Sequence, residues 1–282
     1  MTPNSRRAAF FAAVIGAVFI ALTWPVWQWL WGEWMGNDYY SHGVLIAPVA
    51  LYLAVQRFRH DDALPWPPTS GSNYGLLLLV PGLALYLYFL NGKAYYLAAF
   101  ATVTMIGGLV WTLAGEVSLR KLIFPISYLF FMIPLPFIER TTLPLALFTG
   151  VCSSGLVRLM NLNITVIGNA VKLPNVDLVI GAQCSGINSL IALTALTALA
   201  AYLLKGPLWA RLLLVAFAVP LAMLGNILRV TSLIVMAYVR GVEAAFTFYH
   251  DYSGPIFFIM ALLLLWPLAR LLQLRSLRTD VI

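Results

Sequence analysis

Charged side chains are scarce in this sequence: 10% of its 282 residues are Asp, Glu, Lys or Arg, and 62% are hydrophobic. A soluble domain carries about 25% charged residues. Too little polar surface is present to coat a water-soluble globule, and the mean hydropathy of +0.90 agrees with this. The composition therefore excludes an ordinary soluble enzyme or binding protein and indicates that the bilayer is the solvent.

The apolar stretches also lack the alternation of polar and apolar residues that is typical of a barrel strand. Several of them approach the ~20 residues that cross a hydrocarbon core as a helix. Because only helices and closed barrels satisfy backbone polar groups in lipid, these continuous runs favour helices. We therefore predict an all-α polytopic membrane protein. No internal repeat is visible, so residues 1–282 are expected to form a single integral membrane domain, with no separate soluble domain and none after the last span.

A continuous basic face is missing as well. The net charge is +7, yet the basic residues occur in short clusters between apolar runs. Such clusters mark cytoplasmic loops, whereas a protein that binds nucleic acid gathers its positive charge on one face or along one helix. The charge pattern therefore reports topology and excludes nucleic acid as a partner.

The first apolar run, from Ala8 to Leu30, is too long for a removable signal peptide and has no small-residue cleavage site, so we expect it to be retained. The basic clusters place both termini inside when the chain crosses the bilayer about eight times. The predicted spans are residues 8–31, 43–57, 74–90, 94–114, 121–138, 185–204, 208–238 and 254–273.

The apolar run at 141–160 is left out of this count. If it crossed, Lys205 and Arg211 would lie outside, against the positive-inside rule. It also contains Pro144 and Arg158, which suit a lipid-facing span poorly. We therefore predict an interfacial helix on the outer side.

Two β-branched runs follow between 164 and 180, broken at Gly168-Asn169 and at Pro174-Asn175. This pattern predicts a small extracytoplasmic element that resembles a β-hairpin. The element leads directly into the segment that contains Cys184.

Cys184 lies where this outer loop meets the sixth span. Free N–H groups and the positive end of the helix dipole would stabilise a thiolate there. Ser185 is expected to be the N-cap of the helix. Asn188, one turn further on, is expected on the same helix face as Cys184. Gly186 and Gly181 would let a backbone or a substrate come close.

Two structural interpretations of Cys184 stay open. It could be a small apolar packing residue inside the bundle, or it could form a disulfide with Cys152, because both are predicted to face an oxidising compartment. Cys152 itself lacks the glycines and the helix start that surround Cys184, so it is expected to be a packing residue.

Arg229 is the sharpest polar signal, because no other charge lies near it in a long apolar run. A charge at the bilayer centre costs about 2.5–3.5 kcal/mol, and such residues are usually functional. Asn226, three residues earlier, lies on the same helix face. The alternative is that Arg229 extends to the outer headgroups.

His250 precedes the last span on the same predicted side of the membrane as Cys184 and Arg229. A Cys–His pair generates a nucleophile, and an arginine can stabilise an oxyanion or bind a carboxylate. The three residues together indicate acyl transfer. No metal site is expected, because Cys184, His250 and His42 lack the spacing of metal ligands.

Five strings, in this order along the chain, resemble the exosortase/archaeosortase family of membrane-embedded cysteine transpeptidases, and the resemblance covers nearly the whole sequence. The strings are Asp38-Tyr-Tyr-Ser-His42-Gly43, Phe131-Met-Ile-Pro-Leu-Pro136, Gln183-Cys184-Ser185-Gly186-Ile187, Gly225-Asn226-Ile227-Leu228-Arg229-Val230 and His250-Asp-Tyr-Ser-Gly254.

The resemblance implies an enzyme that recognises a carboxy-terminal sorting signal on exported proteins: a short motif, of the Pro-Glu-Pro type in bacterial exosortases, a transmembrane segment and a basic end. It implies that Cys184 is the nucleophile, His250 the acid and base, and Arg229 the group that stabilises the acyl intermediate. Asp38 and His42, in the first outer loop, would either support the site and contact the signal or anchor the loop at the interface. No cofactor is implied. We expect a bacterial inner membrane, with the site facing the periplasm or the exterior.

Two other functions remain open. A non-catalytic transporter or assembly factor for envelope polymers would use Arg229 to bind an anionic substrate, although no paired inverted halves are visible. A redox relay would use a disulfide between Cys152 and Cys184 and give Arg229 little role.

Overall fold

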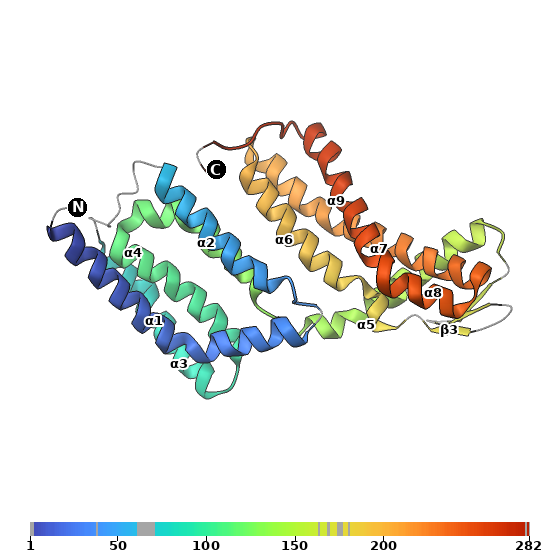
Figure 1. Cartoon of the computed structure of the whole chain (residues 1–282), viewed down its shortest axis with the longest axis horizontal. Helices are drawn as coiled ribbons and strands as arrows, with labels where there is room; N and C mark the ends of the chain where they lie inside the picture. The colour runs from blue at the N-terminus through green and yellow to red at the C-terminus, as the bar shows by residue number, and fades with distance from the viewer. Residues whose placement is uncertain are drawn as a thin grey trace. The chain divides into compact units, whose positions relative to one another are not determined.

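The computed structural model describes residues 3–37, 39–60, 71–162, 164–167, 170–173, 177–179, 181–279 and 281. The chain divides into two compact units, one of Met1–Leu135 with Arg278–Ile282 and one of Pro136–Leu277. Helices make up most of both units (Figure 1). The predicted all-α polytopic class is confirmed, whereas the single integral membrane domain stays a prediction.

The described residues of the amino-terminal unit form four long helices and two short 3₁₀ turns. Tyr86 donates a hydrogen bond from its hydroxyl to Leu22 O at 2.7 Å, which joins the third long helix to the first. Trp34 Nε1 donates to Met132 O at 2.9 Å and joins the first helix to the 3₁₀ turn that follows the fourth. The elements are α1 (Pro3–Gly36), α2 (Gly43–His60), η1 (Asn73–Gly75), α3 (Leu76–Asn91), α4 (Tyr95–Tyr128) and η2 (Leu129–Met132).

Helix α4 covers most of the predicted span 94–114 and the first part of the predicted span 121–138, and the 3₁₀ turn η2 follows it directly. Gly115, with φ 80° and ψ 178°, marks a non-helical break between the two parts. Glycine is the residue that adopts a positive φ without a steric penalty. The helical conformation ends at Met132 rather than at 138, just before Pro134, because proline disfavours the helical conformation of the residue that precedes it.

The second unit contains the segments that carry Cys184, Arg229 and His250. Its helices α6, α7 and α9 lie side by side (Figure 1). Its elements are α5 (Ile138–Leu159), β1 (Thr165–Ile167), β2 (Ala170–Lys172), β3 (Asp177–Val179), η3 (Ala182–Ser185), α6 (Ile187–Leu203), α7 (Leu208–Arg240), α8 (Val242–Phe248), the π-helical turn η4 (Tyr249–Ser253) and α9 (Gly254–Leu271).

Helix α7 packs in this unit through a stripe of buried residues spaced four apart. Small residues in the stripe let helix backbones approach closely, which is how helices associate in lipid. Asn226 continues the same stripe and is therefore directed into the bundle. The buried residues of the stripe up to this point are Ala210, Leu214, Ala218, Ala222 and Asn226.

The predicted β element is a three-stranded antiparallel sheet in the order β1-β2-β3. Val171 of β2 is fully buried and packs in the same core cluster as Cys184. The two predicted breaks fall between the strands and lie outside the described residues. Two glycine- or proline-containing interruptions thus separate three strands, which is one strand more than a single hairpin.

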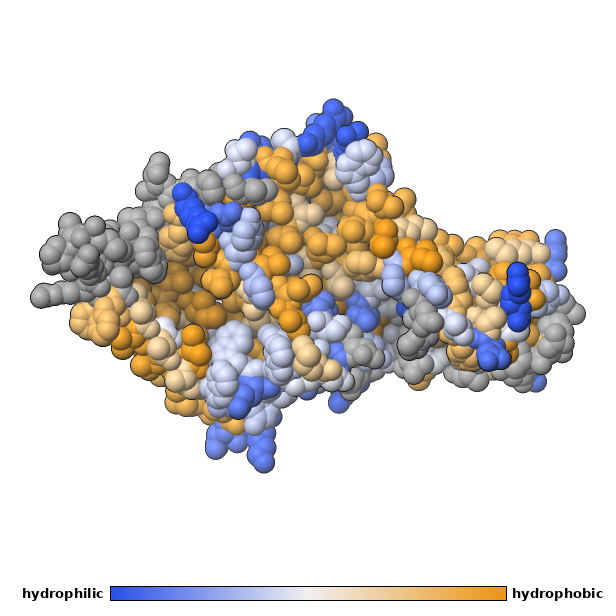
Figure 2. Space-filling model, in the orientation of Figure 1, coloured by the Kyte–Doolittle hydropathy of each residue, from blue (hydrophilic) through white to orange (hydrophobic). Residues whose placement is uncertain are grey.

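Six helical segments in the described part of the chain have the length and hydropathy needed to cross a bilayer, and many of their large apolar side chains are exposed (Figure 2). Helix α6 is shorter, and α2 ends in a polar turn with Arg57 and Arg59. The six segments are Phe10–Gly36, Asn73–Asn91, Tyr95–Met132, Arg140–Leu159, Leu208–Arg240 and Gly254–Leu271.

Helix α5, which covers the predicted interfacial run at 141–160, is therefore long and apolar enough to cross. Several of its small and polar residues face the protein rather than the outside: Thr149 and Ser154 are buried, and Ser153 donates a hydrogen bond to Ile227 O of α7 at 3.0 Å. The interfacial placement and the total of about eight crossings stay predictions.

Candidate active site

Cys184 lies in the short turn η3, between the sheet and α6, and only 7% of its surface is exposed. Its neighbours in the core cluster come from α5, the sheet, α7 and α8. This burial agrees with the interpretation of Cys184 as a packing residue. The polar contact of its sulfur, however, is one that a packing residue does not need.

That contact is made by Tyr249, the first residue of η4. The Tyr249 hydroxyl donates a hydrogen bond to Cys184 Sγ at 3.4 Å. Burial raises the pKa of Tyr249, Cys184 raises it further, and Arg229 acts in the opposite direction. The phenol therefore stays protonated and remains a donor toward the sulfur, and an O–H donor stabilises negative charge on its acceptor.

Arg229 approaches the same tyrosine from α7. The Arg229 guanidinium carbon lies 4.1 Å from the centroid of the Tyr249 ring, and Arg229 Nε donates to Ser253 Oγ at 3.1 Å. Ser253 is fully buried and donates in turn to Tyr249 O at 2.7 Å. The turn η4 thus holds Arg229 through the Tyr249 ring and the Ser253 hydroxyl, and the hydroxyl of the same tyrosine contacts the thiol.

These contacts explain how a charge is tolerated in an apolar helix. A central arginine costs about 2.5–3.5 kcal/mol in lipid. A desolvated cation–π contact returns about 2 kcal/mol, and a hydrogen bond from a charged donor about 1.5–3 kcal/mol. The contacts made by Tyr249 and Ser253 are therefore sufficient to hold Arg229 inside the unit, and extension to the headgroups is not required.

Asn226 connects η3 to the helices. Its Nδ2 donates to Cys184 O at 2.8 Å and to Thr149 Oγ1 of α5 at 3.1 Å. The Asn226 side chain is 5% exposed, and its Oδ1 has no hydrogen-bond partner among the described residues. The amide fixes the backbone of Cys184 and leaves one buried acceptor beside it.

Gly186 separates Cys184 from α6 and corrects two predictions. Gly186 is the N-cap of α6 and has a φ of +72°, so the helix begins one residue later than predicted and Ser185 is not its N-cap. The Ser185 hydroxyl instead accepts a hydrogen bond from the Ile187 N–H at 3.4 Å. Because the left-handed residue breaks the helical repeat, Asn188 does not share a face with Cys184 and is exposed. A Cβ at Gly186 would lie 2.4 Å from Asn226 Cγ, which is the close approach that this glycine permits.

His250 follows Tyr249 in the π-helical turn, one residue from the contacts described above. Its side chain lies outside the described part of the structure, as does Asp38. His42 belongs to the amino-terminal unit, where its ring stacks on Tyr40 with a centroid distance of 5.9 Å. Burial lowers its pKa.

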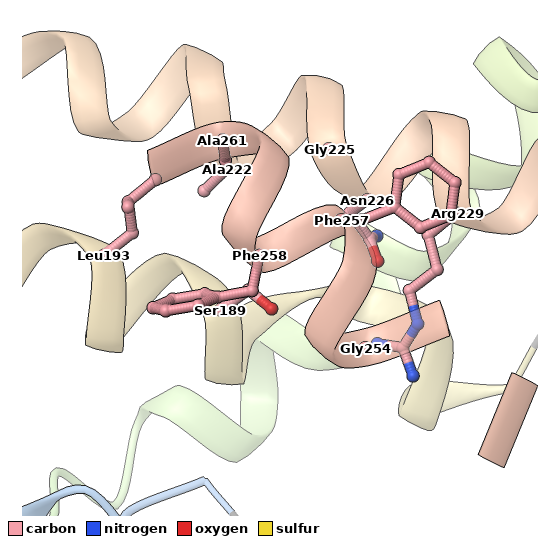
Figure 3. A pocket seen from close by; sticks show the side chains of 10 residues that line it. All are labelled: Ser189, Leu193, Ala222, Gly225, Asn226, Arg229, Gly254, Phe257, Phe258 and Ala261. Carbon is pink, nitrogen blue, oxygen red and sulfur yellow. The ribbon is translucent and has the colours of Figure 1, made fainter. Parts of the chain in front are cut away.

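A narrow crevice of about 10 Å³ runs between α6, α7 and α9 beside Asn226 and Arg229. Figure 3 shows the Arg229 side chain extending toward the first turn of α9, where Gly254 lies. Ser189 of α6 and Asn226 of α7 add polar groups to a lining that is otherwise apolar. The crevice thus brings polar groups of α6 and α7 and the start of α9 together beside Arg229.

Both cysteines are free, so no disulfide joins Cys152 to Cys184. Cys152 lies on α5 and is more exposed than Cys184. No group of three or more His, Cys, Asp or Glu residues capable of holding a metal ion occurs within the described residues.

Sequence reasoning did not single out Tyr249, Ser253 or Thr149. Ser253 lies in the string quoted for His250, and Tyr249 directly precedes that string. A tyrosine or serine in a polar loop, however, has no spacing that distinguishes it from an interfacial residue. The only available signal was their position within four residues of a candidate base. The contacts arise from the π-helical turn, which no sequence pattern indicated.

The fold and this geometry define a helical integral membrane protein in which a buried thiol and an arginine of the long apolar helix α7 contact the same tyrosine. The family model for transmembrane exosortases matches residues 34–267, and the chain belongs to that family. No curated protein and no solved structure matches the chain.

Proposed function

We propose that this exosortase is a cysteine endopeptidase and transpeptidase that uses Cys184, Arg229 and His250. The observation that carries the proposal is that the Tyr249 side chain contacts both Cys184 Sγ and the Arg229 guanidinium. A thiol beside an O–H donor and near a fixed positive charge is suited to react as a thiolate, which is the nucleophilic form of cysteine.

The proposed reaction proceeds through a thioester. His250 takes the thiol proton, and Cys184 Sγ attacks the carbonyl carbon of a peptide bond, forming a C–S bond. The tetrahedral oxyanion is stabilised by Arg229. The C–N bond then breaks, His250 returns the proton to the leaving amine, and the acyl group remains on Cys184 until water or an amine displaces it.

Support for His250 comes from its place in the chain. It follows Tyr249 directly and lies on the turn that carries both contacts. Histidine is the side chain whose ordinary pKa best suits proton transfer near neutral pH.

The proposed substrates are exported proteins with a carboxy-terminal sorting signal of a short Pro-Glu-Pro-type motif, a transmembrane segment and a basic end. Family membership supports this choice. We further propose that the protein resides in a bacterial inner membrane with Cys184 on the extracytoplasmic side. The distribution of basic residues supports that orientation.

The experiment is co-expression with a tagged protein that carries such a signal. We expect Cys184→Ala, Arg229→Ala and His250→Ala each to reduce processing at least about 100-fold, the scale of losing a nucleophile or general base, while the protein still inserts. Cys152→Ala is the matched control and should process normally. Normal processing by Cys184→Ala would refute the proposal. Loss of processing in Arg229→Ala, with normal processing in the other two variants, would favour an anion transporter.

Alkylation with a small membrane-impermeant thiol reagent gives a second measurement. Cys184 is the more buried of the two cysteines, so accessibility alone predicts that Cys152 reacts first. If Cys184 is an activated nucleophile, it reacts first from the outside despite its burial. A faster reaction at Cys152 would contradict the proposed role.

A further inference from the structure

A groove of about 290 Å³ lies between α6 and α9 around Leu265 and Trp266, at the ends of these helices that are far from Cys184 in the sequence. Its lining is apolar except at one end and at Thr197, whose hydroxyl donates a hydrogen bond to Leu193 O at 2.6 Å within its own helix. The apolar part consists mostly of Leu196, Ala200, Leu204, Leu214, Leu262 and Leu265. Arg270 and Arg275 complete the lining where both helices end.

Arg270 is held in place by its own helix. Its guanidinium carbon lies 4.0 Å from the centroid of the Trp266 ring, one turn earlier on α9. Tryptophan is enriched at membrane interfaces. Within the described residues Arg270 has no ion pair, so its hydrogen-bond donors remain available.

Arg275 is positioned by the chain after α9. Gln273 adopts a φ of +60°, and Leu274 N donates back to Ala269 O at 2.9 Å, which turns the chain sharply. Lys205 N then donates to Ser276 O at 2.8 Å, and Leu204 pairs with Leu277. The tail is thereby fixed to the end of α6.

The close fit of this tail is visible at Gly206, where a Cβ would lie 2.2 Å from Leu274 Cδ2. Leu274 is 2% exposed and packs in the core of the unit. Two arginines from different segments thus lie at one end of the groove, one against the Trp266 ring and one on the packed tail, and neither forms an ion pair with a described residue.

We propose that this groove binds an anionic phospholipid, with its phosphate between Arg270 and Arg275 and an acyl chain along α6 and α9. From Leu262 to Arg270 the helix rises about 12 Å, close to the ~15 Å of hydrocarbon in one leaflet. Basic pockets between transmembrane helices on the cytoplasmic side bind anionic headgroups, and the basic clusters predict this end to be cytoplasmic.

A transmembrane segment of a substrate is a poorer occupant. The expected sorting signals end in basic residues, and these would meet Arg270 and Arg275 with the same sign of charge. Like charges repel, whereas a phosphate neutralises both guanidinium groups and can bind them in a bidentate manner.

The test compares phosphatidylglycerol with phosphatidylcholine of the same acyl chains, added to the purified protein in neutral detergent and followed by native mass spectrometry and thermal unfolding. We expect phosphatidylglycerol to bind more tightly, and Arg270→Gln with Arg275→Gln to weaken it about 30-fold, since each basic residue near the surface contributes about fivefold. Inorganic phosphate alone should not raise the melting temperature.

Two further variants complete the design. Arg120→Gln with Lys121→Gln removes the same charge from the amino-terminal unit and should keep the lipid preference. Ala200→Phe fills the groove and should weaken the binding of phosphatidylglycerol, although both arginines are intact. Equal binding of the two lipids, or unchanged phosphatidylglycerol binding by the double arginine variant with its fold intact, would overturn the proposal. Loss of the lipid would leave the proposed chemistry at Cys184 untouched.

Discussion

At the scale of single residues, the second unit places its polar groups around Tyr249. This side chain uses its hydroxyl for Cys184 and its ring for Arg229, so two different properties of one residue hold two different functional groups. The two properties can be separated by mutation, because phenylalanine keeps the ring and loses the hydroxyl.

Tyr249→Phe is expected to lower kcat/KM for the processing of a sorting-signal substrate by about 10- to 100-fold, because a hydrogen bond to a charged partner contributes about 1.5–3 kcal/mol. Tyr249→Leu should cost more, since Arg229 then also loses its ring contact. Single-turnover cleavage by the purified variants measures both. Equal activity of Tyr249→Phe and the wild type would show that the hydroxyl has no part in the reaction.

His42 gives a prediction for pH. Burial lowers its pKa below the ordinary 6.5, so just below that pH the unfolded chain binds more protons at this position than the folded chain. The contribution of His42 to the free energy of unfolding is therefore full above pH 6.5 and is lost as the pH falls through the lowered pKa. We expect the melting temperature of the wild type to fall on acidification, and that of His42→Gln to fall less. Identical slopes would assign the pH dependence to other groups.

At the scale of elements, the junction of η3 and α6 decides where Cys184 lies. Gly186 turns the chain with a positive φ and gives Asn226 room to reach Cys184 O. The junction therefore depends on a residue without a side chain.

Gly186→Ala is expected to destabilise the protein by about 1–3 kcal/mol, because a left-handed alanine costs about 1–2 kcal/mol and its Cβ would overlap Asn226. Processing should fall in parallel, since the backbone of Cys184 loses its support. Gly181→Ala is the matched control from the same loop, where a Cβ meets nothing within 4 Å. Thermal unfolding and cleavage assays of both variants test this, and similar behaviour of the two would contradict it.

Much of this arrangement follows from the sequence. Long apolar runs predicted the helices, and the isolated charge of Arg229 identified it as a functional candidate. The relation of Asn188 to Cys184 was predicted wrongly, because a periodicity argument assumes one continuous helix and Gly186 interrupts it. Tyr249 was missed, because its contacts bring together residues 65 and 20 positions apart, and no local pattern encodes such distances.

At the scale of the whole molecule, two properties of α5 and the chain around it indicate different placements of this helix relative to the bilayer. It meets the length and hydropathy of a crossing helix, whereas the distribution of basic residues favours an outer interfacial position.

Single cysteines at Arg140 and Asn161, in a background without the two native cysteines, test the interfacial prediction. Both positions are exposed; Arg140 lies in the first turn of α5, and Asn161 lies two residues after its end. We expect an impermeant maleimide to label both in intact spheroplasts, and Ser276→Cys to be labelled only after permeabilisation. Protection of either Arg140→Cys or Asn161→Cys would show that α5 crosses.

The π-helical turn η4 makes the molecule unusually sensitive to chain length at one place. Such a turn accommodates one residue more than an α-helical turn. Successive residues of an α-helix are related by a rotation of about 100° around the helix axis. A one-residue deletion within Tyr249–Ser253 would therefore change the phase between the tyrosine and α9 while shortening the chain by less than one per cent. An indel there would thus act like an active-site substitution, even without changing any side chain that takes part in the chemistry.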